Sequence, residues 1–249
     1  EGGSDDDTFK VSDGQDIIVT GGGDDTLEVS AGYTIQNIIL DDTSGHLTFN
    51  LKKADDSLHS VMVENSKTAP LSTLRVRSED DGVTTTTDFS LAVSYNETTN
   101  TFSAKTDSPT LIIGTGSAET LQGGAASDRL VGNAGDDILD GGGGDDALEG
   151  GPGANIYRVS DGDDSIITSS ELDVLEIGFD YQLGSIELDR GTGDLTFSVV
   201  KKSDGSKHSV GVKGLDVDPI SSVKIFKSDT EFDTYDVTFV QVERNVKTK

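Results

Sequence analysis

The sequence predicts an all-β protein, and three observations lead to that prediction. Glycine- and aspartate-rich segments repeat with a period of nine residues, and the segments that follow them alternate polar and apolar residues with a period of two. No long stretch sustains the 3.6-residue period of a helix. The nine-residue segments occur at the amino terminus and again in the middle of the chain. We therefore expect two tandem copies of one unit, the first of them truncated.

The composition favours cations as partners. Asp and Glu number 46 against 19 Lys and Arg, which gives a net charge of -27. This charge opposes binding to nucleic acid phosphates and to anionic membranes. Only 33% of the residues are hydrophobic, so something must offset the self-repulsion before the chain can fold. The chain has no Cys, and a metal site would therefore use oxygen ligands.

The ends of the sequence suggest part of a longer protein. No apolar run approaches the roughly 18 to 20 residues of a membrane span. The chain begins EGGSDDDTF, without the Met, basic segment or apolar stretch of a signal peptide. We expect a fragment with no transmembrane segment.

Five consecutive nonapeptides cover residues 114–158, and their phase continues for two more turns. They read GTGSAETLQ, GGAASDRLV, GNAGDDILD, GGGGDDALE and GGPGANIYR. The sixth position holds Glu119, Asp128, Asp137, Asp146, Asn155, Asp164 and Asp173. The eighth holds Leu121, Leu130, Leu139, Leu148, Tyr157, Ile166 and Leu175, which we expect to form the core.

The amino terminus carries the same phase. Asp7, Asp16 and Asp25 are nine residues apart, and apolar residues follow each of them by two positions. An offset of 148 aligns residues 1–18 with the segment that starts at residue 149, and the likeness extends into the alternating segments behind both. The repeated unit is therefore a nonapeptide array followed by a flank.

The two best nonapeptides, GNAGDDILD and GGGGDDALE, match the pattern G-G-x-G-x-D-x-U-x, in which U is a large apolar residue. On these motifs the chain resembles the RTX (repeats-in-toxin, haemolysin-type calcium-binding) blocks of bacterial proteins exported by type I secretion, among them haemolysins, adhesins, proteases and lipases. The resemblance implies a calcium-loaded parallel β-roll, in which each nonapeptide forms a turn and a short strand. Alternate turns then lie on opposite edges, and turns that stack are two nonapeptides apart.

Stacked turns have to share ions, because calcium takes six to eight oxygen ligands at about 2.3 to 2.6 Å and one short turn supplies too few. One edge would carry Glu119, Asp137, Asn155 and Asp173, and the other Asp128, Asp146 and Asp164. We expect about five calcium ions in the second roll and at least one in the first. The predicted metal-binding residues, some acting through turn carbonyls, are Asp7, Asp16, Asp25, Glu119, Asp128, Gly132, Ala134, Asp136, Asp137, Gly141, Gly143, Asp145, Asp146, Gly150, Asn155, Asp164 and Asp173.

The domain organisation follows from where the period changes. We predict the end of a first roll over residues 1–29, an antiparallel β flank or linker over 30–110, a complete roll over 111–177 and an antiparallel β cap over 178–249. The flanks would cover the open strand edges of the rolls.

Two features of the flanks recur in both copies. His59 and His208 are equivalent, and we favour exposed strand or turn residues over a metal ligand or a pH switch. The pairs Lys52-Lys53 and Lys201-Lys202 also recur, and we favour a guard against edge-to-edge aggregation over contact with an anionic surface.

The resemblance implies that low cytosolic calcium leaves the repeats unfolded and that calcium outside the cell folds them. We therefore predict a secreted, extracellular bacterial calcium-binding module that supports a larger toxin, adhesin or exoenzyme, with neighbouring repeat blocks and the type I secretion apparatus as partners. No HExxH or GxSxG motif is present, so we expect no catalysis in these residues. The alternatives are an adhesin module that binds a glycan or peptide, with the insertion RVRSEDDGVTTTTD as a candidate site, and a carboxy-terminal support domain of a protease, lipase or epimerase.

Overall fold

The computed structural model describes a protein of β-strands and turns. The described residues are 1–41, 44, 46–64, 71–80, 83–91, 93–96, 98–105, 107–168, 172–189, 191–213, 220, 222–228 and 230–236. They include no helix, and hence none that could cross a membrane. The predicted all-β class is confirmed.

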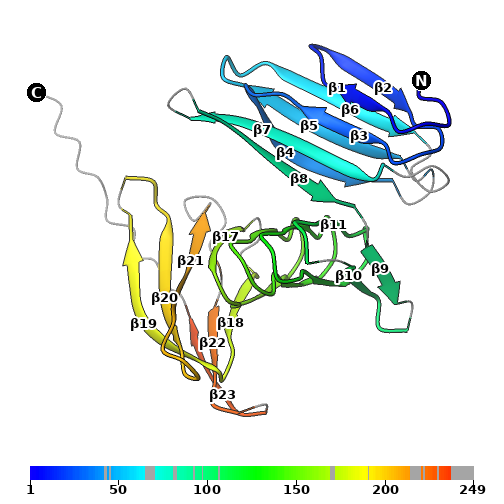
Figure 1. Ribbon diagram of the computed structural model, residues 1–249. Coiled ribbons are helices and arrows are strands. Elements are labelled where there is room, and N and C mark those ends of the chain that lie inside the picture. Colours follow the sequence, from blue (N-terminus) through cyan, green and yellow to red (C-terminus); the bar gives the residue numbers. More distant parts are fainter. Residues whose placement is uncertain are drawn as a thin grey trace, which may run out of the picture.

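A parallel β-roll occupies the middle of the chain (Figure 1). Successive strands alternate between two sheets, and each strand pairs in parallel with the strand two nonapeptides later. The register from Thr120↔Ile138 onward keeps the expected 18-residue spacing. The strands are β10 (Thr101–Ala104), β11 (Leu111–Ile113), β12 (Thr120–Gln122), β13 (Arg129–Val131), β14 (Ile138–Asp140), β15 (Ala147–Glu149), β16 (Ile156–Arg158), β17 (Asp163–Ile167) and β18 (Val174–Ile177).

The core of the roll is a double file of eighth-position side chains. Leu121 pairs with Leu139 and Leu139 with Tyr157 in one sheet, while Leu130, Leu148 and Ile166 align in the other. All of these side chains are buried. Because side chains alternate between the two faces of a strand, the seventh and ninth positions face outward. The prediction that the eighth position forms the core is confirmed.

The roll begins earlier than its glycines suggest. Strand β11 pairs with β13, which places Thr110 at a sixth position and Ile112 at an eighth, both of them buried. Strand β10 pairs in parallel with β12, but Thr101 faces Thr120, so its register is shifted by one residue. Strand β11 begins where the roll was predicted to begin, at residue 111, whereas β10 was not predicted, because its segment lacks the glycine pair that marks a turn.

The second flank continues both sheets of the roll. Strand β21 pairs in parallel with β17, and β22 pairs in parallel with β18. The strands beyond them pair antiparallel, as predicted for the flanks. The parallel joins were not predicted, since alternation alone does not reveal strand direction. The strands are β19 (Tyr181–Leu188), β20 (Leu195–Lys201), β21 (Lys207–Lys213), β22 (Ser222–Phe226) and β23 (Phe232–Asp236).

The first body, which consists of the two sheets formed by strands β1 to β8, repeats this arrangement. Strand β2 joins β6 and β3 joins β7 in parallel, as β17 joins β21 and β18 joins β22. Strands β4 and β19 even share a bulge at the same place, between Ile35 and Asn37 and between Leu183 and Ser185. The prediction of two tandem copies is confirmed. The strands that precede β10 are β1 (Thr8–Lys10), β2 (Gln15–Val19), β3 (Thr26–Val29), β4 (Tyr33–Leu40), β5 (Leu47–Lys53), β6 (Leu58–Glu64), β7 (Thr73–Asp80), β8 (Val83–Ser90) and β9 (Val93–Asn96).

The segment RVRSEDDGVTTTTD is a hairpin rather than a loop insertion. Strands β7 and β8 pair antiparallel from Thr73↔Ser90 to Asp80↔Val83. Residues 81 and 82 lie outside the described part of the chain. The described residues of this segment are therefore paired strands, because the threonine run is β-forming and pairs with its neighbour, and its role as a candidate binding site stays a prediction.

We expect Leu139→Ala to destabilise the calcium-saturated protein by about 2 to 5 kcal/mol, because it removes one rung of the buried file and leaves a cavity. Denaturant unfolding followed by circular dichroism measures this loss. Leu58→Ala is the matched control, since the side chain of Leu58 is 76% exposed and its loss should cost less than about 0.5 kcal/mol. Equal losses for the two variants would contradict the assigned core.

Candidate calcium site

From residue 119 onward the sixth-position side chains of the roll are acidic or amide groups, and all of them are buried. Their exposure is at most 4%, including that of the four central carboxylates Asp128, Asp137, Asp146 and Asp164. Charged groups of this kind are seldom buried unless a hydrogen bond, an opposite charge or a metal ion compensates them. The partners of each carboxylate oxygen therefore show what the site lacks.

One oxygen of each sixth-position side chain from Asp128 to Asp173 is used to join the turns, whereas both oxygens of Glu119 accept from Thr115 in its own turn. The joining oxygen accepts a hydrogen bond from the backbone N–H of the sixth-position residue 18 positions earlier. The donor–acceptor distances lie between 2.7 and 3.2 Å along both edges of the roll. The structure thus brings together Glu119, Asp137, Asn155 and Asp173 on one edge and Asp128, Asp146 and Asp164 on the other.

The second oxygen separates these residues into two groups. Asp128 Oδ2 accepts from the N–H of Gly124 at 2.6 Å, and Asp164 Oδ2 accepts from the hydroxyl of Ser160 at 2.9 Å. Within the described part of the chain, Oδ2 of Asp137 and Oδ2 of Asp146 are buried without a hydrogen-bond partner. Such orphaned oxygens are the expected mark of a ligand that the protein itself does not supply.

Burial also changes the acidity of these groups. It raises the pKa of Asp137 to about 7, that of Asp146 to about 8 and that of Asp164 to about 6, in each case chiefly because the charged form loses hydration. Neighbouring carboxylates add to the effect at Asp146. A divalent cation would reverse it, because it favours the ionised form.

The first position of the two central turns has to be glycine because the carboxylate lies against its backbone. A Cβ atom on Gly132 would lie 2.4 Å from Asp137 Oδ2, and one on Gly141 would lie 2.0 Å from Asp146 Oδ2. The fourth position is constrained differently, since Gly144 has a φ of 98° that side chains rarely adopt. These glycines hold the backbone close to the orphaned oxygens.

The donor set fits calcium. No group of three or more His, Cys, Asp or Glu side chains gathers in the described ranges, so a metal here would take carboxylates from stacked turns together with backbone carbonyls. Calcium accepts such a flexible, carbonyl-rich shell, whereas zinc prefers nitrogen or sulfur ligands. The residues that would hold it are Asp137, Asp146 and the turns around them, where its charge would compensate the buried carboxylates.

The fifth-position acids have a role that the sequence did not indicate. Asp136 Oδ1 accepts from the N–H of Ala154 at 2.8 Å, and Asp145 Oδ1 accepts from the N–H of Asp163 at 2.9 Å. Both acids are exposed, and both bonds span 18 residues. Ala134 and Gly143 lie in the same turns as Asp136 and Asp145, and Gly150 begins the next turn. None of the three has a side chain that could bind a metal, so only their backbone carbonyls could do so.

Asn155 interrupts the carboxylate ladder. Its Oδ1 accepts from the N–H of Asp137 at 3.1 Å, and its Nδ2 donates to the carbonyl of Gly151 at 2.8 Å. The amide therefore satisfies both of its ends within the protein, and it presents a donor where aspartate has an oxygen.

The truncated first roll keeps one full pair. The N–H of Asp7 donates to Asp25 Oδ1 at 3.0 Å, and Asp25 is buried. Asp16 lies on the other edge, where Ser12 donates to its Oδ2 through both its N–H and its hydroxyl. The pair Asp7 and Asp25 corresponds to Asn155 and Asp173 of the second roll, with an acid in place of the amide.

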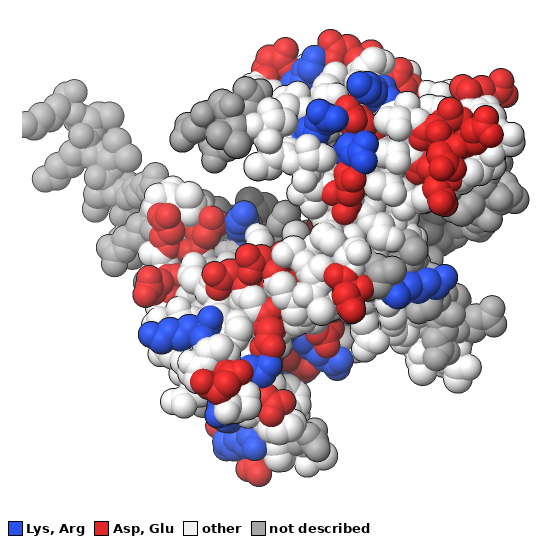
Figure 2. Space-filling model, in the orientation of Figure 1, with Lys and Arg blue, Asp and Glu red and all other residues white. Residues whose placement is uncertain are grey.

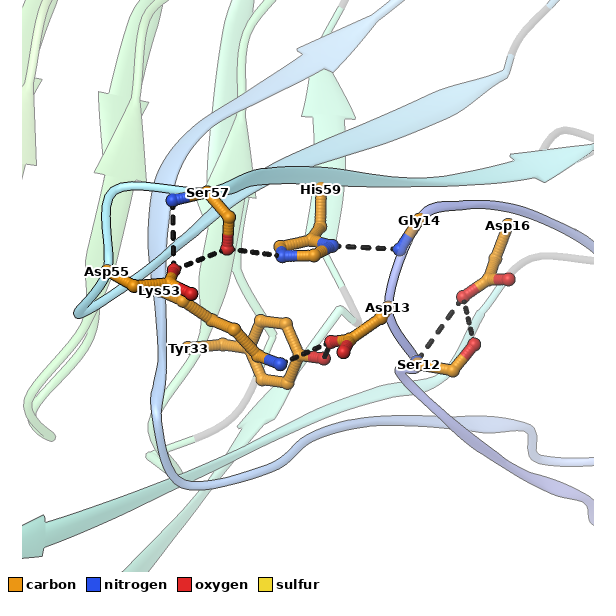
Figure 3. Close-up of polar contacts among 9 residues, drawn as sticks. All are labelled: Ser12, Asp13, Gly14, Asp16, Tyr33, Lys53, Asp55, Ser57 and His59. Carbon is orange, nitrogen blue, oxygen red and sulfur yellow. Dashed lines mark hydrogen bonds and ion pairs between the residues drawn. The ribbon is translucent and has the colours of Figure 1, made fainter.

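A polar cluster ties the turn that holds Asp16 in the first roll to the first flank (Figure 3). His59 accepts a hydrogen bond from the N–H of Gly14 at Nδ1 (2.8 Å), and its Nε2 lies 2.9 Å from the hydroxyl of Ser57. The hydroxyl of Tyr33 donates to Asp13, which also pairs with Lys53. These contacts lower the pKa of Asp13, with the Lys53 bond as the largest cause.

The second copy has the same cluster. His208 accepts from Gly162 N–H at 2.8 Å, while Tyr181 and Lys201 bind Asp161. The expectation of exposed, uninvolved histidines was wrong, because both rings are partly buried and both of their nitrogens have partners. One lysine of each pair, Lys53 or Lys201, forms an ion pair with an aspartate of the neighbouring turn and does not protect a sheet edge from aggregation.

The surface carries the acidic excess that the composition predicts. Figure 2 shows red Asp and Glu side chains over the first body and over the second flank, with fewer blue Lys and Arg side chains among them. Several of the basic groups are paired with acids, as Arg75 is with Asp88 at 2.7 Å. The described surface therefore favours cations over phosphates.

Comparison with known proteins identifies the repeats. Residues 1–34, 113–148 and 149–176 match a family model described as RTX calcium-binding nonapeptide repeat (4 copies). These segments are RTX repeats, and this part of the chain is a calcium-binding module. The search of curated proteins gave no match.

Two solved structures are similar at low identity. The AlgE6R3 subunit of the Azotobacter vinelandii mannuronan C5-epimerase is 21% identical with a TM-score of 0.36, over 56% of this chain and 87% of that one. The extracellular lipase LipA of Serratia marcescens is 19% identical with a TM-score of 0.25, over 86% of this chain and 35% of that one. This chain thus spans about a third of the lipase.

We expect Gly141→Ala to weaken calcium binding about tenfold or more, because the added methyl group would displace Asp146 from the site. Gly143→Ala is the matched control in the same turn, since its Cβ would have no neighbour closer than 3.6 Å. Isothermal titration with calcium compares the two. Similar losses for both variants, or none for Gly141→Ala, would contradict this account of the first position.

The raised carboxyl pKa values also predict how the calcium-free protein responds to pH. An unfolded chain with the ordinary value of 3.8 has released these protons by about pH 5, whereas folded Asp137 and Asp146 keep theirs up to about 7 and about 8. The folded state therefore binds more protons between about pH 4 and pH 8, and its stability without calcium falls as pH rises through this window.

Circular dichroism of the chelated protein at pH 5, 6, 7 and 8 measures this dependence, because the small fraction of β structure that remains without calcium should decrease from pH 5 to pH 8. The double variant Asp137→Asn and Asp146→Asn should flatten it, since the amides do not titrate. A calcium-free stability that rose from pH 5 to pH 8 would have the wrong sign and would overturn the assignment.

Proposed function

We propose, from its RTX repeats, that this chain is a module of a secreted bacterial protein. The module folds outside the cell when calcium binds to it. It thereby supports the export and stability of a larger toxin, adhesin or exoenzyme. The observation that carries the proposal is the pair of buried, unpartnered carboxylate oxygens of Asp137 and Asp146. Removing two charged groups from water without compensation opposes folding. Calcium supplies the compensation, so its binding free energy becomes folding free energy.

The central turns would bind calcium most tightly. Asp137 and Asp146 each have an oxygen available, whereas the equivalent atoms of Glu119 and Asp128 accept a backbone hydrogen bond. Asn155 has no second oxygen to offer. We therefore place the strongest sites at Asp137 and Asp146, and the remaining sixth-position residues, with Asp7, Asp16 and Asp25 of the first roll, complete a set of about five ions plus at least one.

Export requires an unfolded chain, and the calcium affinity of such modules would provide it. Extracellular calcium modules have dissociation constants of roughly 10⁻⁴ to 10⁻³ M, so cytosolic calcium would leave the chain empty. The net charge of -27 then keeps it expanded. The proposed folding units are residues 1–29 and 111–177 as rolls, and 30–110 and 178–249 as flanks that extend the sheets of the rolls.

The alternatives concern the parent protein. An epimerase, lipase or protease could carry the module as a carboxy-terminal support, and an adhesin could use a flank to bind a glycan or peptide. The paired strands β7 and β8 leave no open loop among the described residues of the segment first considered for such binding.

Circular dichroism during a calcium titration tests the proposal. We expect little β structure in chelator and cooperative folding as calcium rises to about 5 to 10 mM, with magnesium a poor substitute because its small octahedral shell suits this turn less well. Calorimetry then gives the number of ions. Unchanged β structure and stability between chelator and calcium would overturn the proposal, and equal folding by magnesium would reduce it to charge screening.

A further inference from the structure

Strands β4 and β19 are equivalent edge strands, one in each copy. They align at the 148-residue offset, share a bulge and pair antiparallel with the next strand in the same register. Ile38 faces Phe49 in the first copy, and Ile186 faces Phe197 in the second. The two strands therefore present corresponding side chains on corresponding faces.

Their burial is nevertheless very different. Ile38 is fully buried, whereas Ile186 is 52% exposed and Leu188 is 50% exposed. Large apolar side chains exposed together on a strand mark a surface that is suited to a partner. The residues that lie against β4 in the first copy show which kind of partner would fit the equivalent Ile186 of β19 in the second copy.

The start of the second roll lies against strand β4 and shares a core cluster with Ile38. Ile38 belongs to the same core cluster as Leu111 of β11 and Val131 of β13, and both of those side chains are buried. Strand β4 lies against β11, and Figure 1 shows the first body beside this end of the roll. The first flank thus docks on the outer face of the opening rungs that follow it.

The opening rungs are suited to this contact. Leu111 occupies the seventh position of β11, and Val131 occupies the ninth position of β13. Both side chains face outward, because the adjacent eighth-position residues, Ile112 and Leu130, face the roll core. Later strands of the same sheet carry Ala147 and Glu149 at these outward positions. Large apolar side chains at outward positions of this sheet are therefore adjacent only at the start of the roll, and the next one, Ile167, lies on β17.

We propose that the exposed face of β19, formed by Ile186 and Leu188, is a docking site for the opening rungs of another β-roll of this kind, which would cover it as Leu111 and Val131 cover β4. The partner is recognised by outward apolar residues on its first two rungs. Roll-and-flank units would then stack in series, each flank holding the roll behind it. The contact rests on the repeated architecture and is independent of how many ions each roll binds.

A chain extended by one unit tests this. In this longer chain, a second copy of residues 91–249 follows directly after Asp236. Asp236 pairs with Ser222 as Ser90 pairs with Thr73, so the new junction copies the existing one. The natural sequence has no Cys, and Ile186→Cys therefore gives a single site for maleimide labelling. In calcium we expect labelling to be at least about tenfold slower in the extended chain than in the 249-residue chain. Ile17→Cys, exposed in β2 of the first copy, is the control and should label equally in both.

Replacing the Leu111 and Val131 equivalents of the added roll by Asp should restore fast labelling. Equal labelling of the Ile186→Cys variant in both chains, with circular dichroism showing that the added roll has folded, would overturn the proposal. Protection of the introduced thiol in the 249-residue chain that grows with protein concentration would also overturn it, in favour of edge-to-edge self-association. Failure of calcium to fold either chain would be visible in the same spectra and would count against the proposed function instead.

A measurement in trans decides the case if the added roll does not fold. Ile38→Asp should release the first flank and uncover Leu111 and Val131, so that these chains associate head to tail through β19 in calcium. Adding Ile186→Asp should abolish the association, while Glu187→Gln on the same strand should not. Absence of any association sensitive to Ile186→Asp would overturn the proposal.

Discussion

The fold depends on one constraint, the burial of a carboxylate, or of an amide at Asn155, at the sixth position of the stacked turns. One oxygen of that group accepts the backbone N–H of the turn stacked on it, as Asp146 does from Asp128. This bond keeps the turns in register while the eighth-position side chains fill the space between the sheets. The other oxygen of Asp137 and of Asp146 is left without a partner in the described part of the protein. The same side chain therefore both organises the backbone and creates the demand for a cation.

The repeating part of the structure could be predicted from the sequence because its two signals reinforce each other. An acid and an apolar residue two positions apart, repeated every nine residues, determine which side chains face the turn and which face the core. Stacking at two-nonapeptide spacing followed from the resemblance to RTX repeats, and the register of β12 to β18 agrees with it. The predicted roll included β11, whereas β10 was missed because its segment has no glycine pair and its register is shifted by one residue.

The remaining parts depend on contacts that a local pattern does not encode. Alternation in the flanks predicted strands, yet the parallel joins of β21 and β22 to the roll depend on residues more than 40 positions apart. The cluster of His59 with Gly14 has the same origin, since its members are recognisable only once the flank lies on the turn. The difference between Asp137 and Asp128 is finer still, because it turns on whether a nearby N–H reaches the second oxygen.

The two sheets of the roll end in the same flank, and this limits how the length of the protein can change. Strand β17 has to meet β21 while β18 meets β22, so each sheet must arrive at the flank on its own side. Adding or removing one nonapeptide would exchange the two edges and send each strand to the wrong partner. A change of two nonapeptides leaves every pairing intact. The roll can therefore lengthen or shorten during evolution in steps of 18 residues, the spacing of its stacked turns.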